Sequence, residues 1–187
     1  YNSKEIRCFS HVHCWQLAGV PVMPTTGEIT GNKGMDDYKS AYSHDSEIVK
    51  PGYHKVELDK YKIGVELTST ARVGMHRYTY PAGEKANVLF DVGALLAHGK
   101  TEKAAIHRIS SKEIGGYSVL APTSRRKKPV TVYFVARFNQ NMTEFGGWEK
   151  EGEDKKLVRK NSIEGTDIGG YASFDKLKKQ SLLMKVG

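Results

Sequence analysis

The side chains best suited to chemistry lie close together near the N-terminus, between Ser10 and Trp15. The segment SHVHCW contains a serine, the two histidines His11 and His13, a cysteine and a tryptophan. Imidazole and hydroxyl groups form hydrogen bonds with polar ligands, and an indole ring stacks on flat apolar surfaces. An apolar run, residues 17–23, follows and ends in a proline and turn residues. We therefore predict a loop that presents polar and aromatic side chains between two strands.

The two cysteines, Cys8 and Cys14, bracket the histidines in the pattern C-x2-H-x-H-C. A structural zinc site normally has a C-x2-C pair and a second pair of ligands, and neither is present. A disulfide between Cys8 and Cys14 is the alternative in an oxidising compartment, since a bend can bring their Cα atoms within about 6 Å of each other. We expect two free thiols, one on a strand and one in the loop, and no bound metal.

Length and charge limit the classes of protein. The chain has 187 residues, enough for one well-buried domain, residues 1–187. The formal net charge is +8, but the basic runs at 125–128 and 150–160 contain no interleaved aromatic residue, which argues against a nucleic-acid partner. They are typical of solvated loops. No stretch is long and apolar enough to predict a membrane span.

Alternating apolar residues predict an all-β fold. Every second residue from Tyr61 to Leu67, within the expected strand Tyr61–Thr70, and from Val130 to Phe138 is apolar, as in half-buried antiparallel strands. No stretch keeps a helical apolar period over three turns. We predict a predominantly antiparallel two-sheet β-sandwich with little helix. Further strands are expected, in chain order, at 1–11, 38–42, 56–58, 72–80, 87–92, 103–109, 116–121, 168–174 and 181–186, with 56–92 as one meander and 27–37 and 149–160 as loops.

Four ordered motifs carry a resemblance to a known family. They are FSHVHCWQLAGVPVMPTTG, YSHDSEIVKPGY, VELTSTARVGMHRYTYP and YFVARFNQNMTEFGGW. Together they resemble the N-terminal domain of glycoside hydrolase family 92, the calcium-dependent exo-acting alpha-mannosidases. The similarity runs from about Cys8 to Lys185.

The resemblance implies one part of a larger enzyme. In this family a β-sandwich precedes a helical (α/α)6 barrel, and the active site lies where the two meet. The barrel supplies the general acid, the general base and most calcium ligands, so the 187 residues alone are expected to be inactive. The full-length enzyme would remove terminal alpha-linked mannose from glycans by an inverting mechanism, with the barrel domain as partner. The resemblance also implies a secreted or periplasmic bacterial protein.

By motif position, the resemblance places sugar contacts on Trp15, His13 and His11. An indole face suits the apolar C–H surface of a pyranose, and imidazoles suit its hydroxyl groups. The structural alternative is that Trp15 packs in the core against Leu17 or Met23 and that His13 is a hydrogen-bonded polar residue.

No catalytic pair of carboxylates stands out. An inverting glycosidase needs two, roughly 6.5–9.5 Å apart. Glu57, Glu66 and Asp91 are interpreted as surface or sheet-pair charges. We expect His76 and Arg77 to lie on opposite faces of one strand, in structural roles, unless a bulge at Gly74 redirects them.

Trp148 follows two glycines and is interpreted as a core or rim residue, with a second stacking platform as the alternative. An independent carbohydrate-binding or adhesion-type sandwich without catalysis stays open as the alternative function. The sequence that follows Gly187 in the parent gene separates the two functions.

Overall fold

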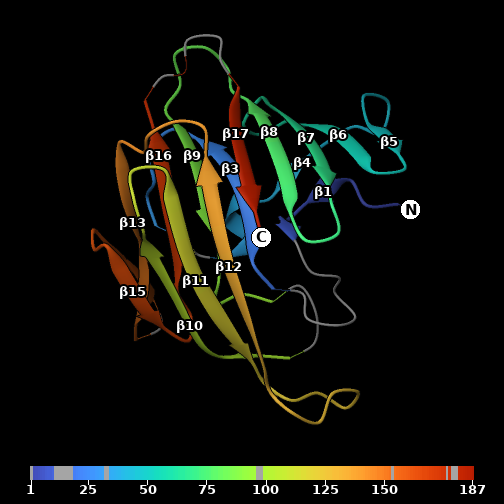
Figure 1. Cartoon of the computed structure of the whole chain (residues 1–187). Coiled ribbons are helices and arrows are strands. Elements are labelled where there is room, and N and C mark those ends of the chain that lie inside the picture. The colour runs from blue at the N-terminus through green and yellow to red at the C-terminus, as the bar shows by residue number, and fades with distance from the viewer. Residues whose placement is uncertain are drawn as a thin grey trace.

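The fold is a sandwich of two antiparallel β-sheets that lie face to face (Figure 1). The computed structural model describes residues 2–10, 19–31, 34–95, 99–152, 154–175, 177 and 181–187. Within these residues the helical content is a single short element, α1 (Met35–Tyr38). The predicted all-β, two-sheet architecture with little helix is confirmed.

The larger sheet has nine strands. Their spatial order is β15 (Ser162–Gly165), β10 (Thr101–Arg108), β11 (Glu113–Leu120), β12 (Val130–Phe138), β17 (Leu182–Val186), β8 (Gly74–Thr79), β7 (Ile63–Ser69), β6 (Tyr53–Leu58) and β5 (Ile48–Lys50). The last strand, β17, therefore lies in the middle of the sheet. It joins the block β5–β8, from the first half of the chain, to the block β10–β12 and β15 from the second half.

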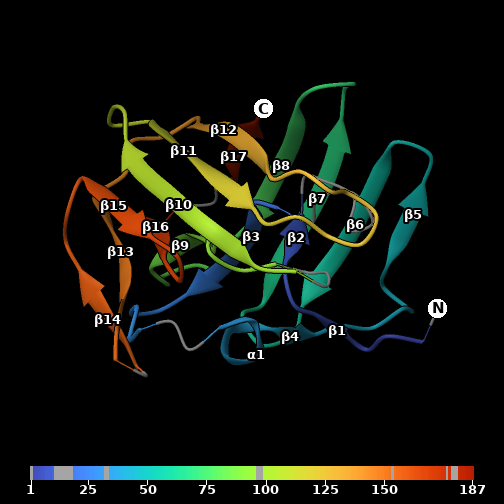
Figure 2. The same cartoon turned by 90° about the horizontal axis from the view of Figure 1, so that it is seen from below.

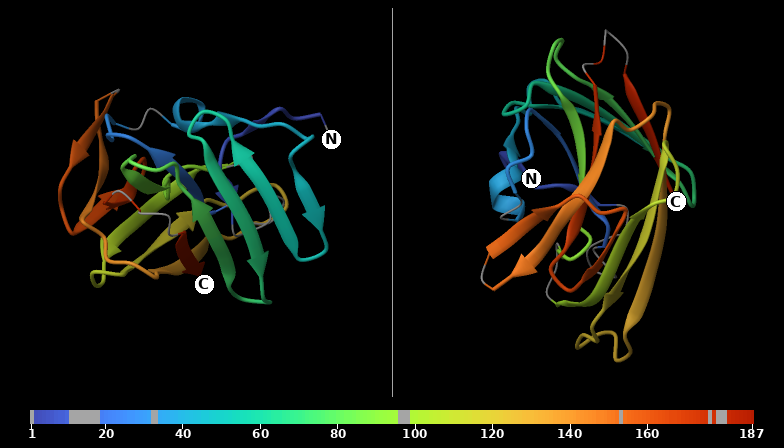
Figure 3. Two further views of the ribbon diagram at one scale, coloured as in Figure 1. Left: turned by 90° about the horizontal axis from the view of Figure 1, so that it is seen from above. Right: turned by 90° about the vertical axis from the view of Figure 1, so that its left-hand side faces the viewer.

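The smaller sheet has six strands and lies opposite part of the larger one (Figure 3). Their spatial order is β14 (Asp154–Val158), β13 (Glu144–Glu151), β16 (Gly169–Phe174), β9 (Ala86–Phe90), β3 (Pro21–Thr26) and β2 (Phe9–Ser10). A separate two-stranded sheet pairs β1 (Glu5–Ile6) with β4 (Ser40–Ala41). The predicted strand at 38–42 is thus present in shortened form.

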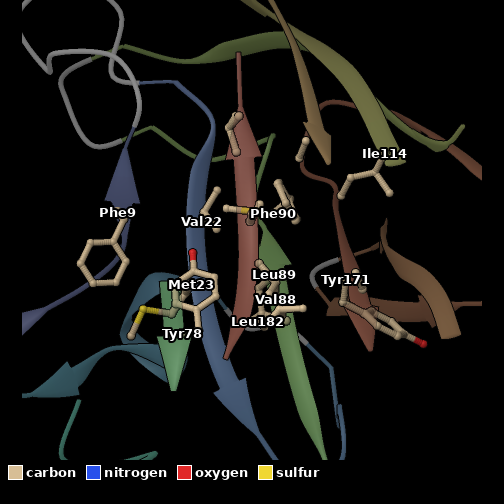
Figure 4. Packing of buried hydrophobic residues seen from close by; sticks show 14 of the residues in the cluster. Phe9, Val22, Met23, Tyr78, Val88, Leu89, Phe90, Ile114, Tyr171 and Leu182 are labelled. Carbon is tan, nitrogen blue, oxygen red and sulfur yellow. The ribbon is translucent and has the colours of Figure 1, made fainter. Parts of the chain in front are cut away.

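The core fills the space between the two sheets. In β12 the side chains of Phe134, Ala136 and Phe138 are buried while their neighbours point outward, as the alternating sequence predicted. Phe134 stacks on Phe90 of the opposite sheet, with ring centroids 5.9 Å apart. Figure 4 shows part of this core, with Phe90 from the smaller sheet and Leu182 from the larger. The alternation of apolar and polar residues therefore indicates which face of each strand packs against the other sheet.

Two predicted connections are wrong. The strand at 87–92, now β9, does not continue the meander of β6, β7 and β8, but crosses to the smaller sheet between β3 and β16. All five of its residues are buried, which suits a strand in the middle of a covered sheet.

The segment 149–160 is not a loop: it contains the hairpin of β13 and β14. Gly152, with φ of 64°, makes the turn, and ion pairs such as Lys160–Glu149 at 2.9 Å hold its charged side chains.

One smaller expectation also changes. Within the segment 27–37, residues 27–31 and 34 are irregular, and α1 begins at Met35. No bulge occurs at Gly74, whose pairing with Ser69 and with Val186 continues the registers of β7 and β17 without a shift.

Candidate functional site

The larger sheet extends beyond the smaller one on the side of β5, β6 and β7 (Figure 2). One end of this overhang is covered by α1, β4 and β1. Tyr61 donates a 2.9 Å hydrogen bond to the carbonyl of Tyr38, and the amide of Asp59 donates a 2.9 Å bond to the carbonyl of Ala41. The inward-facing residues at this end, such as Ile63, are fully buried.

The other end of the overhang is open and forms a groove of about 570 Å³. Its floor consists of inward-facing side chains from β6, β7, β8, β12 and β17: His54, Leu67, His76, Phe134 and Val186. The opposite wall comes from the edge of the smaller sheet, through residues 9, 10 and 20. The groove is therefore the uncovered end of the space between the sheets.

His76 is held firmly in the floor of the groove. Its Nδ1 lies 2.7 Å from the hydroxyl of Tyr78, and its ring meets the ring of Phe9 edge-on at 6.4 Å. Burial raises the pKa of Tyr78 well above its usual value, so this phenol stays neutral. Arg77 points to the outer face, where it pairs with Glu66 at 2.8 Å. The prediction that residues 76 and 77 lie on opposite faces is confirmed.

The candidate ligand loop begins and ends at this groove. Phe9 pairs with Val22 and Ser10 with Pro21, and the hydroxyl of Ser10 donates a 3.0 Å hydrogen bond to the carbonyl of Gly19. The stem on either side of residues 11–18 is therefore fixed at the groove wall. The predicted sugar contacts Trp15, His13 and His11, together with Cys14, lie outside the described residues.

A histidine–glutamate–histidine cluster lies beside the groove. Glu47 accepts hydrogen bonds of 2.8 Å from His44 Nδ1 and from His54 Nε2, and His44 Nε2 lies 2.9 Å from the carbonyl of Ser3. The side chain of Glu47 is only 7% exposed. The cluster fixes the segment before β5 against β6. The motif SHDSE contained this signal, because residues 44 and 47 lie three apart and the turn at Pro51 and Gly52 folds β6 back toward them.

The carboxylates do not form a catalytic pair at the groove. The described residues that line the groove include neither aspartate nor glutamate. Glu57 is exposed, and Glu66 pairs with Arg77 on the outer face, as predicted for sheet charges. The hydrogen bond from Tyr53, together with Arg77, lowers the pKa of Glu66. The groove's own polar groups are imidazoles, hydroxyls and the cations of Lys50 and Arg72.

Asp91 is not the surface charge that the sequence suggested. It is 1% exposed and accepts a 2.9 Å hydrogen bond from Tyr38. Burial, together with the charge of Asp91, raises the pKa of the nearby Cys8 thiol to about 12. Cys8 is a free cysteine, as expected for the strand cysteine. The alternating pattern could not show that Asp91 is buried, because a buried carboxylate and an exposed one occupy the same position in such a pattern.

Trp148 is a core residue and not an exposed stacking platform. Its side chain is fully buried against Gly169, where an added Cβ would lie 1.9 Å from Trp148 Cζ2. The interpretation of Trp148 as a core residue is confirmed.

Across the described ranges, no cluster of three or more His, Cys, Asp or Glu side chains is arranged to bind a metal ion. The four-residue α1 falls far short of the length that a bilayer span needs, and the described part of the chain holds no longer helix.

Comparison with solved structures places this sandwich among family 92 enzymes. The chain is similar to the family GH92 alpha-mannosidase BT3965 from Bacteroides thetaiotaomicron, solved in complex with mannoimidazole, at 27% identity and a TM-score of 0.82. The match covers 100% of this chain and 26% of the mannosidase. The chain thus spans about a quarter of that relative's length.

Two further structures share the fold at lower identity. They are the gh92 family glycosyl hydrolase ccman5, at 24% identity and a TM-score of 0.84 over 100% of this chain and 26% of that one, and the inverting mannosidase BT2199 from Bacteroides thetaiotaomicron VPI-5482, at 17% and 0.69 over 89% and 21%. No curated protein sequence matches the chain. The sequence profile of the glycosyl hydrolase family 92 N-terminal domain matches residues 1–187. The chain therefore belongs to this family of N-terminal domains.

Proposed function

We propose that this chain is the N-terminal domain of a longer exo-acting alpha-mannosidase that removes terminal alpha-linked mannose from glycans. The observation that carries the proposal is the family match over residues 1–187, combined with a fold similarity that covers the whole chain but 26% of a mannosidase. A domain that matches so completely within a much longer enzyme is best explained as one of that enzyme's building blocks.

The chain's contribution is one wall of the sugar pocket. In this proposal Trp15 stacks on the apolar face of the mannose ring, and His13 and His11 exchange hydrogen bonds with its hydroxyl groups. Support comes from the stem: Ser10 and Gly19 are tied together at the wall of the groove, so the segment between them starts and ends there.

The chemical step belongs to the rest of the enzyme. Inverting hydrolysis needs an acid and a base on opposite sides of the bond, and the described lining of the groove offers imidazoles, hydroxyls and cations but no carboxylate. In this proposal most calcium ligands also belong to the larger domain, as the resemblance to the family implies. The protein acts outside the cytoplasm, in the periplasm or as a secreted enzyme.

Isolated from that domain, the chain should neither hydrolyse nor bind mannose well. One stacked ring and one or two exposed hydrogen bonds each contribute about 1 kcal/mol, whereas millimolar binding needs about 4 kcal/mol. The 187 residues alone are expected to leave an aryl alpha-mannoside intact even with calcium present. Turnover that co-purifies with the protein would contradict this.

The decisive experiment is Trp15→Ala in the full-length enzyme, with Trp15→Phe as a matched control that keeps an aromatic face. We expect kcat/KM to fall at least about tenfold for Trp15→Ala, equal to ~1.4 kcal/mol of transition-state stabilisation, and much less for Trp15→Phe. The melting temperature is measured alongside. Unchanged activity would show that Trp15 is not part of the pocket. A parallel loss of activity and melting temperature would show that Trp15 is a core residue.

A further inference from the structure

The rim of the groove carries exposed apolar side chains. Val49 is 67% exposed and Val73 is 37% exposed, and both line the groove. They come from two separate parts of the larger sheet: β5 and the turn before β8. Large apolar side chains gathered around one concavity are unfavourable in water and typical of a surface that another protein surface covers.

The floor beneath this rim is apolar but incompletely buried. Leu67 and Val132 are both half-buried, although Val65 and Phe134, one pair further along the same strands, are buried. Burial thus stops at the groove and not at the end of the strands. Side chains inserted from outside would complete the core that the two sheets begin.

The charges around the groove are of one sign. Lys50 and Arg72 line it, no aspartate or glutamate of the described chain does so, and no salt bridge to a described carboxylate involves either cation. A matching surface would therefore bring carboxylates to these two positions. A second copy of this chain would instead set cation against cation if the two grooves met.

The backbone at residue 187 also lies in the groove. The amide of Val135 donates a 2.8 Å hydrogen bond to the carbonyl of Gly187, and the amide of Gly187 returns a 3.1 Å bond to Val135. Gly187 itself is part of the lining. Residues that follow it in a longer chain therefore start at this concavity.

We propose that the groove is the docking surface for the larger domain of the full-length protein, which inserts an apolar ridge flanked by carboxylates between Val49 and Val73. The inference rests on the proposed function, because it takes its partner from the three quarters of the relative's length that this chain does not cover. The carboxylates of the ridge pair with Lys50 and Arg72, and its apolar side chains cover Leu67 and Val132.

Thiol labelling in the full-length protein tests this surface. In a Cys14→Ser background, Val49→Cys reports on the groove, and Ile109→Cys, at a position that is 49% exposed and does not line it, is the matched control. If the groove is uncovered, the Val49→Cys thiol should react with a maleimide at least as fast as the Ile109→Cys thiol, because Val49 is the more exposed residue. Docking predicts at least about tenfold slower labelling at Val49→Cys, with equal rates after unfolding in urea.

Three outcomes would overturn the inference. Equal labelling of the two thiols in the folded protein would mean that the groove is open. Protection that disappears on dilution, together with dissociation of a dimer in light scattering, would assign the groove to a second copy. Protection that arises only when mannose oligosaccharide is added would make it a glycan site. Hydrolysis of an aryl alpha-mannoside, measured on the same protein, tests the proposed function separately: protection without activity would overturn only that function.

Discussion

Tyr38 and Asp91 are joined by a 2.9 Å hydrogen bond between phenol and carboxylate, although they are 53 positions apart in the sequence. The bond ties α1 to the residue that follows β9, and both side chains are buried. Burial and the charge of Asp91 raise the pKa of Tyr38, so the phenol keeps the proton that it donates. This contact fixes the element that covers one end of the overhang.

Removing the phenol should therefore destabilise the domain. Tyr38→Phe withdraws a donor from a buried carboxylate, which typically costs about 1.5–3 kcal/mol of unfolding free energy. Tyr133→Phe is the control, because Tyr133 is 74% exposed and its variant should stay within about 0.5 kcal/mol of the parent. Urea unfolding followed by tryptophan fluorescence measures both. Indistinguishable midpoints for the two variants would show that the bond is not stabilising.

Two strand glycines should respond in opposite ways to alanine. At Gly169 an added Cβ would lie 1.9 Å from Trp148 Cζ2, so Gly169→Ala forces the indole or the backbone to move and should cost about 1–3 kcal/mol or more. At Gly64 the nearest atom would be Thr79 Cβ at 3.6 Å, an ordinary contact. Gly64→Ala should be neutral or stabilising by up to about 1 kcal/mol. Thermal unfolding of both variants checks the pair, and a stable Gly169→Ala would disprove the packing argument.

Cys8 should be nearly inert toward thiol reagents. Burial, together with the charge of Asp91, raises its pKa from 9.0 to about 12, which lowers the thiolate fraction at pH 8 by about a thousandfold. In a Cys14→Ser variant, whose only thiol is Cys8, the reaction with Ellman's reagent should be slower than in urea-unfolded protein by at least about a hundredfold. Equal rates in the folded and unfolded protein would place the thiol at the surface.

Glu144 should contribute to the loss of stability in acid. Burial opposes its ionisation, but hydrogen bonds from Tyr171, Lys85 and Arg159 outweigh it and lower the pKa of Glu144 below 4.5. The stabilisation is therefore present above pH 4.5 and is lost as the pH falls through the lowered value.

The matching variant is Glu144→Gln. It should cost about 1–3 kcal/mol at pH 7, and the difference from the parent should shrink toward pH 2.5. Glu28→Gln is the control, because Glu28 is 78% exposed and, among the described residues, forms an ion pair with Lys85 alone. Melting temperatures from pH 7 to pH 2.5 distinguish them. If the difference in melting temperature between Glu144→Gln and the parent does not change with pH, the effect does not come from the ionisation of Glu144.

The parts of the fold that were predictable are those in which one strand face is buried and the other is not. Residues 61–70 and 130–138 fit this description, and both were correctly assigned. The hairpin of β13 and β14 was missed because β13 is buried on both faces between residues 145 and 148 and then becomes charged, so no alternation marks it. β5, with three exposed residues, gave no signal either.

The sequence singled out the loop that follows Ser10, and the structure places Ser10 at the wall of the groove. The loop itself lies outside the described residues, so the position of the site stays a prediction. The described lining of the groove comes from β2, β5, β6, β7, β8, β12 and β17, and no local pattern shows that these strands meet. The roles of Trp15, His13 and His11 stay predictions. Glu47 joins His44 and His54 only because β5 and β6 form a hairpin.

The position of β17 in the larger sheet has a consequence for synthesis. Residues 182–186 pair with β12 on one side and β8 on the other, so translation delivers the strand that closes the sheet last. Until these residues leave the ribosome, β5–β8 and β10–β12 are two separate blocks, each with an unpaired edge. The nascent chain must keep both edges from pairing elsewhere while synthesis continues, and the domain then closes in one late, non-local step.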